Sequence, residues 1–237
     1  MTTTKEWPHP WQPGIMESVL ALVQAPDGDF GILAQLAHAA SDPQSLQTMV
    51  EYLRQTPIGE QAFHERPRLQ TIDLHQLQQL PPETLGYAYA QHMQENNLKP
   101  ILAGDAHSDS DFLQVHITET HDIWHVLTGS DTSILGEIQL EAFYVAQLYA
   151  SRFWTALLAK NLLKAAIDNI EVSTQYLDAL SHGWRLAKQA QPLFGVDWSQ
   201  WWDTPLEDVR ATFNLAVNGY SSGLLEQFVV PSPQQSP

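Results

Sequence analysis

Apolar positions recur with helical spacing along most of the chain, and this pattern predicts helices as the main structural element. In an amphipathic helix the apolar residues return every three or four positions and form one face. The segments with this spacing are 14–25, 30–40, 43–55, 83–97, 109–127, 133–163 and 165–190. The alternation typical of strands does not occur in a convincing series. We therefore predict an all-α fold, a helical bundle of about seven to ten helices.

Residues at the ends of these segments agree with the helix prediction. Asp42-Pro43 and Pro82-Glu83 are typical of helix starts, and Asn96-Asn97 is typical of a helix end. Two segments with Pro and Gly, 56–67 and 99–105, interrupt the pattern. Neither segment is long enough to establish a domain boundary.

We expect a single all-α domain over residues 1–228. The chain has 237 residues, of which 43% are hydrophobic and 10% aromatic, so it can bury a sizeable core. Residues 229–237 are rich in Pro, Ser and Gln, a composition typical of a disordered tail.

The chain is strongly acidic, with a formal net charge of −16 at pH 7. This charge repels phosphate backbones, so nucleic acid is a poor partner. The sequence has no cysteine, which excludes disulfides, thiolate nucleophiles and cysteine-ligated zinc or iron–sulfur sites. It also has no Gly-rich phosphate loop and no nucleophile elbow. Any metal must therefore be bound by nitrogen and oxygen atoms.

The candidate metal ligands begin with His121 and His125. Four residues advance an α-helix by about 400°, so the two imidazoles lie one turn apart on the same face. The segment 128–133 consists of cap and turn residues, which predicts a second helix with Glu137 in its first turns. Glu137 can then fold back towards the imidazoles, and Asp122 serves as ligand, orienting residue or base. Two histidines and a carboxylate suit zinc, iron or manganese.

Two alternatives compete with this interpretation. The zinc protease motif has Glu after the first histidine, where this chain has Asp122, which disfavours a protease. A solvated polar face would also explain the spacing, because polar residues recur along the helix at positions 111, 114, 118, 122 and 125. The remaining histidines have no spacing that gathers them and are interpreted as structural or surface residues: His9, His38, His64, His75, His92, His107, His116 and His182.

The segment His121-Asp122-Ile123-Trp124-His125 with Glu137 resembles the signature of a coenzyme Q biosynthesis family, that of the fourth Coq protein. The signature reads H-D-x-x-H, eleven residues, then E. The resemblance covers residues 80 to 213 and extends to four further segments: Leu85 to Ala90 with Met93, which resembles a "GxAYAxFM" helix, Trp184 to Ala187, Val196 to Trp202, and Pro205 to Arg210.

The resemblance implies a role in ubiquinone biosynthesis, or in that of a related prenylquinone. It implies action on a polyprenylated benzoquinone precursor at the ring position that bears the carboxylate, by decarboxylation or hydroxylation. It makes His121, Asp122, His125 and Glu137 both the catalytic and the metal-binding candidates. The expected cofactor is a divalent metal, with zinc favoured over iron, manganese or magnesium. The alternative role is a non-catalytic carrier of an isoprenoid lipid that organises other quinone-biosynthesis proteins.

The segment 140–163 is apolar over an unusually wide surface, which suits core packing, a homodimer interface or a groove for a prenyl chain. The charges of Glu141, Arg152 and Lys160 interrupt it too often for a transmembrane span. For the groove, the substrate-binding candidates are Glu141, Tyr144, Leu148 and Trp154. The first residues show neither an Arg-rich presequence nor an apolar signal core, so we expect a cytoplasmic protein, with or without peripheral contact to the inner membrane.

Overall fold

The computed structural model describes residues 11–26, 29–69, 71–149 and 151–217. The tail expected over 229–237 lies outside this range. The described residues form eleven α-helices and two short 3₁₀-helices. The α-helices are α1 (Trp11–Gln24), α2 (Phe30–Ala40), α3 (Pro43–Leu53), α4 (Pro57–Glu65), α5 (Leu74–Leu77), α6 (Leu85–Glu95), α7 (Asp109–Thr128), α8 (Ile134–Leu148), α9 (Arg152–Asp168), α10 (Ser173–Gln189) and α11 (Leu206–Thr212). The 3₁₀-helices are η1 (Ile170–Val172) and η2 (Trp198–Gln200).

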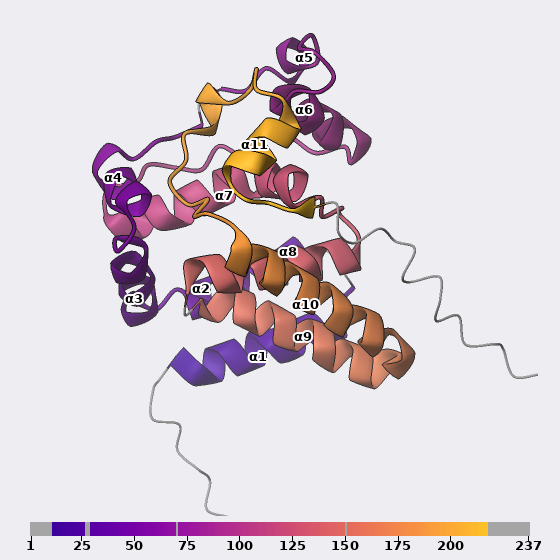
Figure 1. The fold of residues 1–237 in the computed structure, drawn as a ribbon. Helices are drawn as coiled ribbons and strands as arrows, with labels where there is room; N and C mark the ends of the chain where they lie inside the picture. The colour runs from indigo at the N-terminus through magenta and orange to yellow at the C-terminus, as the bar shows by residue number, and fades with distance from the viewer. Residues whose placement is uncertain (1–10, 27–28, 70, 150, 218–237) are drawn as a thin grey trace, which may run out of the picture.

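The predicted all-α class is confirmed. Within the described ranges the only β pairing is an isolated bridge between Thr84 and Pro205. In Figure 1, α1, α9 and α10 lie together at one end of the molecule, α5 and α6 lie at the other end, and α7 lies between them. Helix α8 packs along α10 and also contacts α9 and α7, so it joins the two parts.

Side-chain caps explain why the helices begin where they do. Ser108 and Asp111 form a capping box at the start of α7. The side chain of each residue accepts a hydrogen bond from the backbone N–H of the other. Thr84 caps α6 and Ser133 caps α8 through their hydroxyl oxygens. Asp42 caps α3 with Pro43 in its first turn, as the sequence predicts.

The main hydrophobic core lies between α6, α7, α8 and the C-terminal segment. Its largest fully buried side chains include Trp124, Tyr144, Phe143 and Trp198, which are each at most 1% exposed. A smaller cluster around Leu36 joins α1, α2 and α9. The apolar face of 140–163 is therefore used largely for internal packing, although Tyr149 and Leu163 remain exposed.

Three predicted boundaries are wrong. The segment 165–190 is not one helix, because α9 ends at Asp168, η1 follows and α10 begins at Ser173. The segment 133–163 forms two helices, α8 and α9, because Tyr149 adopts a positive φ of 55° and Ser151 caps a new helix. The break expected over 56–67 is mostly α4, since Thr56 caps a helix that has Pro57 in its first turn. A Thr-Pro pair is a start signal as well as a helix breaker, and here it acts as a start.

The turn between α7 and α8 determines where Glu137 lies. Gly129 ends α7 in the left-handed conformation, with φ of 68°, which favours glycine because it has no Cβ. Ser130 then folds back against α7, and Ser133 starts α8. No helix in the described part of the chain is both long and apolar enough to cross a membrane.

Candidate metal centre

The structure brings together His121, His125 and Glu137. The two Nε2 atoms of the histidines are 3.2 Å apart, and Nε2 of His125 is 3.4 Å from a carboxylate oxygen of Glu137. One ligand atom from each of the three residues lies within 4.8 Å of the other two. The side chain of His125 is 1% exposed, whereas that of Glu137 is 39% exposed. The three residues therefore form a centre with a buried side and a side open to solvent.

Hydrogen bonds orient both imidazoles so that Nε2 can act as a ligand. Nδ1 of His125 is 3.0 Å from the carbonyl oxygen of Ser130, which can only accept, so Nδ1 carries a proton and donates it. Nδ1 of His121 is 3.3 Å from the hydroxyl of Tyr144. Partners of this kind on the second ring nitrogen are typical of metal-binding histidines.

The three residues also shape each other's protonation. Burial lowers the pKa of His121 to about 4, so its imidazole is neutral near pH 7. Burial acts in the same direction on His125, but the hydrogen bond and charge of Glu137 outweigh it and raise the pKa of His125. Burial would raise the pKa of Glu137, but the hydrogen bond and charge of His125 outweigh it and lower that pKa. The carboxylate is therefore charged and available to a cation.

Two of the three separations between the ligand atoms fit a tetrahedral metal ion. Two donor atoms bound to zinc at about 2.0–2.1 Å lie about 3.3–3.4 Å apart when the angle at the metal is tetrahedral. The observed separations of 3.2 and 3.4 Å agree with this value. His121, His125 and Glu137 would hold such an ion, and a set of three protein ligands is typical of catalytic rather than structural zinc sites.

Asp122 does not join this group of three. Its Oδ1 atom lies 4.0 Å from Nε2 of His92, and both side chains are largely buried. Burial raises the pKa of Asp122, with the charge of Glu137 acting in the same direction. No sequence spacing connects His92 with this centre, because His92 lies on α6, whereas Asp122 lies on α7.

An aromatic stack adjoins the centre. The ring of Tyr144 lies between those of Trp124 and Trp154, with centroid distances of 4.4 and 4.2 Å and nearly parallel planes. The ring of His121 is nearly parallel to that of Trp154, at a centroid distance of 6.1 Å. Burial raises the pKa of Tyr144 well above its usual value, so its hydroxyl stays protonated.

An apolar pocket of about 360 Å³ opens beside His121. Its walls come from α2, α3, α7 and the start of α9, and include Leu33, Leu46, Met49, Leu113, Ile117 and Trp154. Polar groups at its edge include Gln114 and Arg152. The pocket therefore joins an apolar volume to the metal-ligand cluster through one shared residue, His121.

The predicted substrate-binding residues occupy different positions around this pocket. Trp154 lines it, and Tyr144 lies behind Trp154 in the aromatic stack. Leu148 is fully buried in the main core. Glu141 is also buried, where its carboxylate accepts a hydrogen bond of 2.9 Å from Asn161. Burial raises the pKa of Glu141 to about 8.

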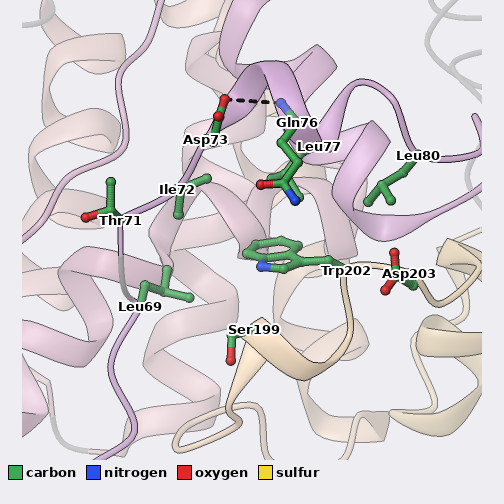
Figure 2. A pocket seen from close by; sticks show the side chains of 10 residues that line it. All are labelled: Leu69, Thr71, Ile72, Asp73, Gln76, Leu77, Leu80, Ser199, Trp202 and Asp203. Carbon is green, nitrogen blue, oxygen red and sulfur yellow. Dashed lines mark hydrogen bonds between the residues drawn. The ribbon is translucent and has the colours of Figure 1, made fainter.

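Other candidates lie away from the centre. His116 is buried, with Nδ1 3.3 Å from the carbonyl of Pro67 and with Nε2 accepting the N–H of Gly195, so it connects two loops. Figure 2 shows a second cavity, of about 380 Å³, between α5 and the segment that carries Trp202. Its lining, as given by the described residues, contains neither histidine nor Glu137.

The chain is similar in sequence to proteins described as ubiquinone biosynthesis proteins. Residues 9–218 match the family described as "Coenzyme Q (ubiquinone) biosynthesis protein Coq4". A curated relative from Anopheles gambiae, "Ubiquinone biosynthesis protein COQ4 homolog, mitochondrial", is 26% identical in an alignment 191 residues long, and the alignment covers 73% of this chain and 62% of the relative. The homolog from Danio rerio is 27% identical in an alignment 183 residues long, which covers 73% of this chain and 65% of that protein. The chain thus spans less than two thirds of the length of these two relatives.

A solved structure also resembles this fold. It is a crystal structure from Nostoc punctiforme PCC 73102, described as a putative ubiquinone biosynthesis protein. The TM-score is 0.77 at 26% sequence identity, and the similarity covers 87% of this chain and 98% of that chain. The helical arrangement in Figure 1 is therefore one that a related protein adopts.

Proposed function

Because the chain belongs to the coenzyme Q (ubiquinone) biosynthesis protein Coq4 family, we propose that it acts on a polyprenylated benzoquinone precursor at the ring position that bears the carboxylate. The prenyl chain occupies the apolar pocket, and the polar ring lies at the cluster of His121, His125 and Glu137. The family membership supports the pathway, and the pocket and cluster support the division between a prenyl end and a ring end.

One observation carries this proposal: His121 belongs to both sites. It lines the apolar pocket, and its Nε2 faces that of His125. A lipid whose polar end leaves the pocket at His121 meets the ligand cluster without crossing the core. An amphipathic substrate with a long apolar tail and an acidic ring fits this arrangement.

The residues of the cluster and its neighbours have separate roles in the proposed reaction. His121, His125 and Glu137 would hold a divalent metal, with zinc favoured by the ligand set. When bound, such an ion polarises a ring carboxylate or hydroxyl, or activates water or oxygen. Tyr144 orients His121, and the carbonyl of Ser130 orients His125. Trp154 lines the pocket beside His121, with its ring nearly parallel to the imidazole, and would contact the apolar part of the substrate next to the ring.

A turnover experiment tests the catalytic proposal. Metal-loaded protein is incubated with a prenylated 4-hydroxybenzoate, in air and without oxygen, and released CO₂ is measured. Non-oxidative removal of the carboxylate releases CO₂ and places a proton on the ring, whereas replacement by hydroxyl also consumes an oxidant such as O₂. We expect release of many equivalents per protein chain. No release under either condition would refute the catalytic proposal.

A non-catalytic carrier and scaffold is the second candidate. It is favoured by apolar side chains exposed on α9, η1 and α10, which suit another quinone-biosynthesis protein or a second copy of this chain. They include Ile167, Ile170, Leu177 and Trp184, which are 64%, 63%, 51% and 43% exposed. This candidate predicts stoichiometric lipid binding without turnover. Protein that holds no isoprenoid lipid and binds none at micromolar concentration would exclude it.

A further inference from the structure

His92 lies beside the candidate metal centre although it belongs to a different helix. Its Nε2 atom is 4.0 Å from Oδ1 of Asp122, and the two side chains are only 12% and 13% exposed. Its ring stacks on that of His125, with centroids 5.5 Å apart and an angle of 24° between the planes. His92 therefore contacts His125, and it faces Asp122, which follows His121 in the chain.

Nε2 of His92 needs a hydrogen-bond partner that Asp122 can supply. Nε2 of His92 is buried and has no hydrogen-bond partner among the described residues. In the same part of the chain, the carboxylate of Asp122 makes no hydrogen bond, and His92 is its only ion-pair contact. A buried polar atom without a partner is unfavourable, and an imidazole N–H and a carboxylate are complementary as donor and acceptor.

We propose that His92 is a positioning residue for Asp122. Its Nε2–H donates to one carboxylate oxygen of Asp122 and leaves the other oxygen directed towards the centre formed by His121, His125 and Glu137. Closing the 4.0 Å separation to hydrogen-bond distance requires a movement of about 1 Å. Carboxylates at metal centres are commonly held by such a second hydrogen bond. The inference rests on the metal centre of the proposed function.

Helix α6 is anchored firmly enough to serve this purpose. At its start, the N–H of Leu85 donates to the carbonyl of Thr204, and the N–H of Gly86 donates to that of Trp202. At its other end, the hydroxyl of Thr132 donates to the side chain of Asn96, 2.6 Å away. This last contact joins α6 to the turn that leads to Glu137, so the positions of His92 and Glu137 are coupled.

Direct ligation by His92 is the competing interpretation, and the geometry disfavours it. The group of ligand atoms that lie within 4.8 Å of one another contains His121, His125 and Glu137, and it does not contain His92. The nearly parallel stacking of His92 on His125 places the first ring beside the second, which suits an outer position.

A double-mutant cycle on metal affinity tests this role. The affinity for Zn²⁺ and Co²⁺ is measured for the full chain and for His92→Phe, Asp122→Ala and the double variant. We expect His92→Phe to weaken binding about tenfold. We expect the double variant to bind no more weakly than Asp122→Ala alone, because His92 acts through Asp122. His75→Phe, which removes an exposed histidine on α5, should leave the affinity unchanged.

Two further measurements separate positioning from general structural damage. His92→Gln keeps a side-chain N–H donor, so we expect it to restore most of the affinity lost in His92→Phe. The visible absorption of bound Co²⁺ reports its ligand geometry, and we expect it to change in His92→Phe and to return in His92→Gln. Circular dichroism confirms that each variant is folded.

The outcomes are distinguishable. Unchanged affinity in His92→Phe, additive losses in the cycle, or no rescue by His92→Gln would each overturn the positioning role. Loss of one metal equivalent at saturation in His92→Phe, with Asp122→Ala unaffected, would make His92 a ligand and also overturn it. If the unaltered chain binds neither metal, the proposed metal centre itself is wrong.

Discussion

At the scale of single residues, His121 and His125 experience opposite electrostatic effects although they are neighbours on one face of α7. Burial keeps His121 neutral, whereas Glu137 draws a proton towards Nε2 of His125. A metal ion and a proton therefore compete for the same atom of His125. The hydrogen bond from His125 to Ser130 can form whether Nε2 carries a metal ion or a proton, because this bond uses Nδ1.

This competition predicts that metal affinity rises with pH. The pKa of His125 is raised above its usual value of 6.5, so below that pKa each metal ion must displace about one proton. We expect affinity to increase about tenfold per pH unit in the acidic range and to level off once His125 is deprotonated. Competition with a chelator, corrected for the chelator's own protonation, measures this. An affinity independent of pH from 5 to 8 would argue against imidazole ligands.

The buried carboxyl group of Glu141 should make the free energy of unfolding depend on pH. Its pKa is raised by burial from about 4.5 in the unfolded chain to about 8 in the folded protein. The folded state therefore favours the protonated form, and stability is lost as the pH rises from about 4.5 through 8. Glu141→Gln removes this loss and can still accept the hydrogen bond from Asn161.

The expected result is a higher midpoint of thermal unfolding for Glu141→Gln at pH 8.5, by about 4 °C or more, and a nearly unchanged midpoint at pH 4.5. Thermal unfolding followed by circular dichroism at both pH values measures the difference. Glu171→Gln, an exposed position on η1, is the matched control and should show no such dependence. Destabilisation at pH 8.5 would mean that the charged carboxylate is required.

At the scale of elements, the spacing within one helix was predictable and the contacts between helices were not. His121 and His125 come from one helix, and the 128–133 turn indicated a return towards Glu137. His92 was missed because no sequence spacing relates α6 to α7. The division of 133–163 was missed because the apolar pattern continues through it, although Ser151 could have indicated a new cap.

The close packing of α8 against α10 depends on Gly183. A Cβ at this position would overlap the carbonyl oxygen of Gln139 on α8, two residues after Glu137. Gly183→Ala must therefore push α8 and α10 apart. A shift of α8 also moves Glu137 relative to the two histidines on α7.

We expect Gly183→Ala to lower the free energy of unfolding by about 2 kcal/mol or more and to weaken metal binding. Chemical denaturation and a metal titration measure the two effects. Gly104→Ala is the control, because a Cβ there has open space, and it should change stability by less than about 0.5 kcal/mol. Full stability in Gly183→Ala would show that the helices can separate without cost.

At the scale of the whole molecule, two structural parts meet at the candidate site. Helices α2, α3 and α9 contribute to the apolar pocket, and α7 and α8 supply the ligand cluster. The segments from which the sequence resemblance was drawn begin at residue 80, but the family match begins at residue 9, and the N-terminal third forms much of the pocket wall. Apolar residues such as Leu33 and Leu46 look like ordinary core positions in the sequence, so the pocket could not be predicted from them.

A larger side chain in the pocket should displace lipid without affecting metal. Ala37 lines the pocket on α2, so Ala37→Phe fills part of its volume. We expect this variant to lose most of its bound isoprenoid lipid and to keep its metal. Lipid mass spectrometry and elemental analysis measure both. Ala34→Phe, an exposed position on the same helix, is the matched control and should retain lipid.

The most direct test of the account is elemental analysis and lipid mass spectrometry of one purified sample, with a His121→Ala, His125→Ala double variant beside it. We predict about one divalent metal per chain together with an isoprenoid lipid in the unaltered protein, and loss of the metal in the double variant. Equal metal content in both proteins, or none in either, would contradict the metal centre and identify the histidine pair as a polar helix face.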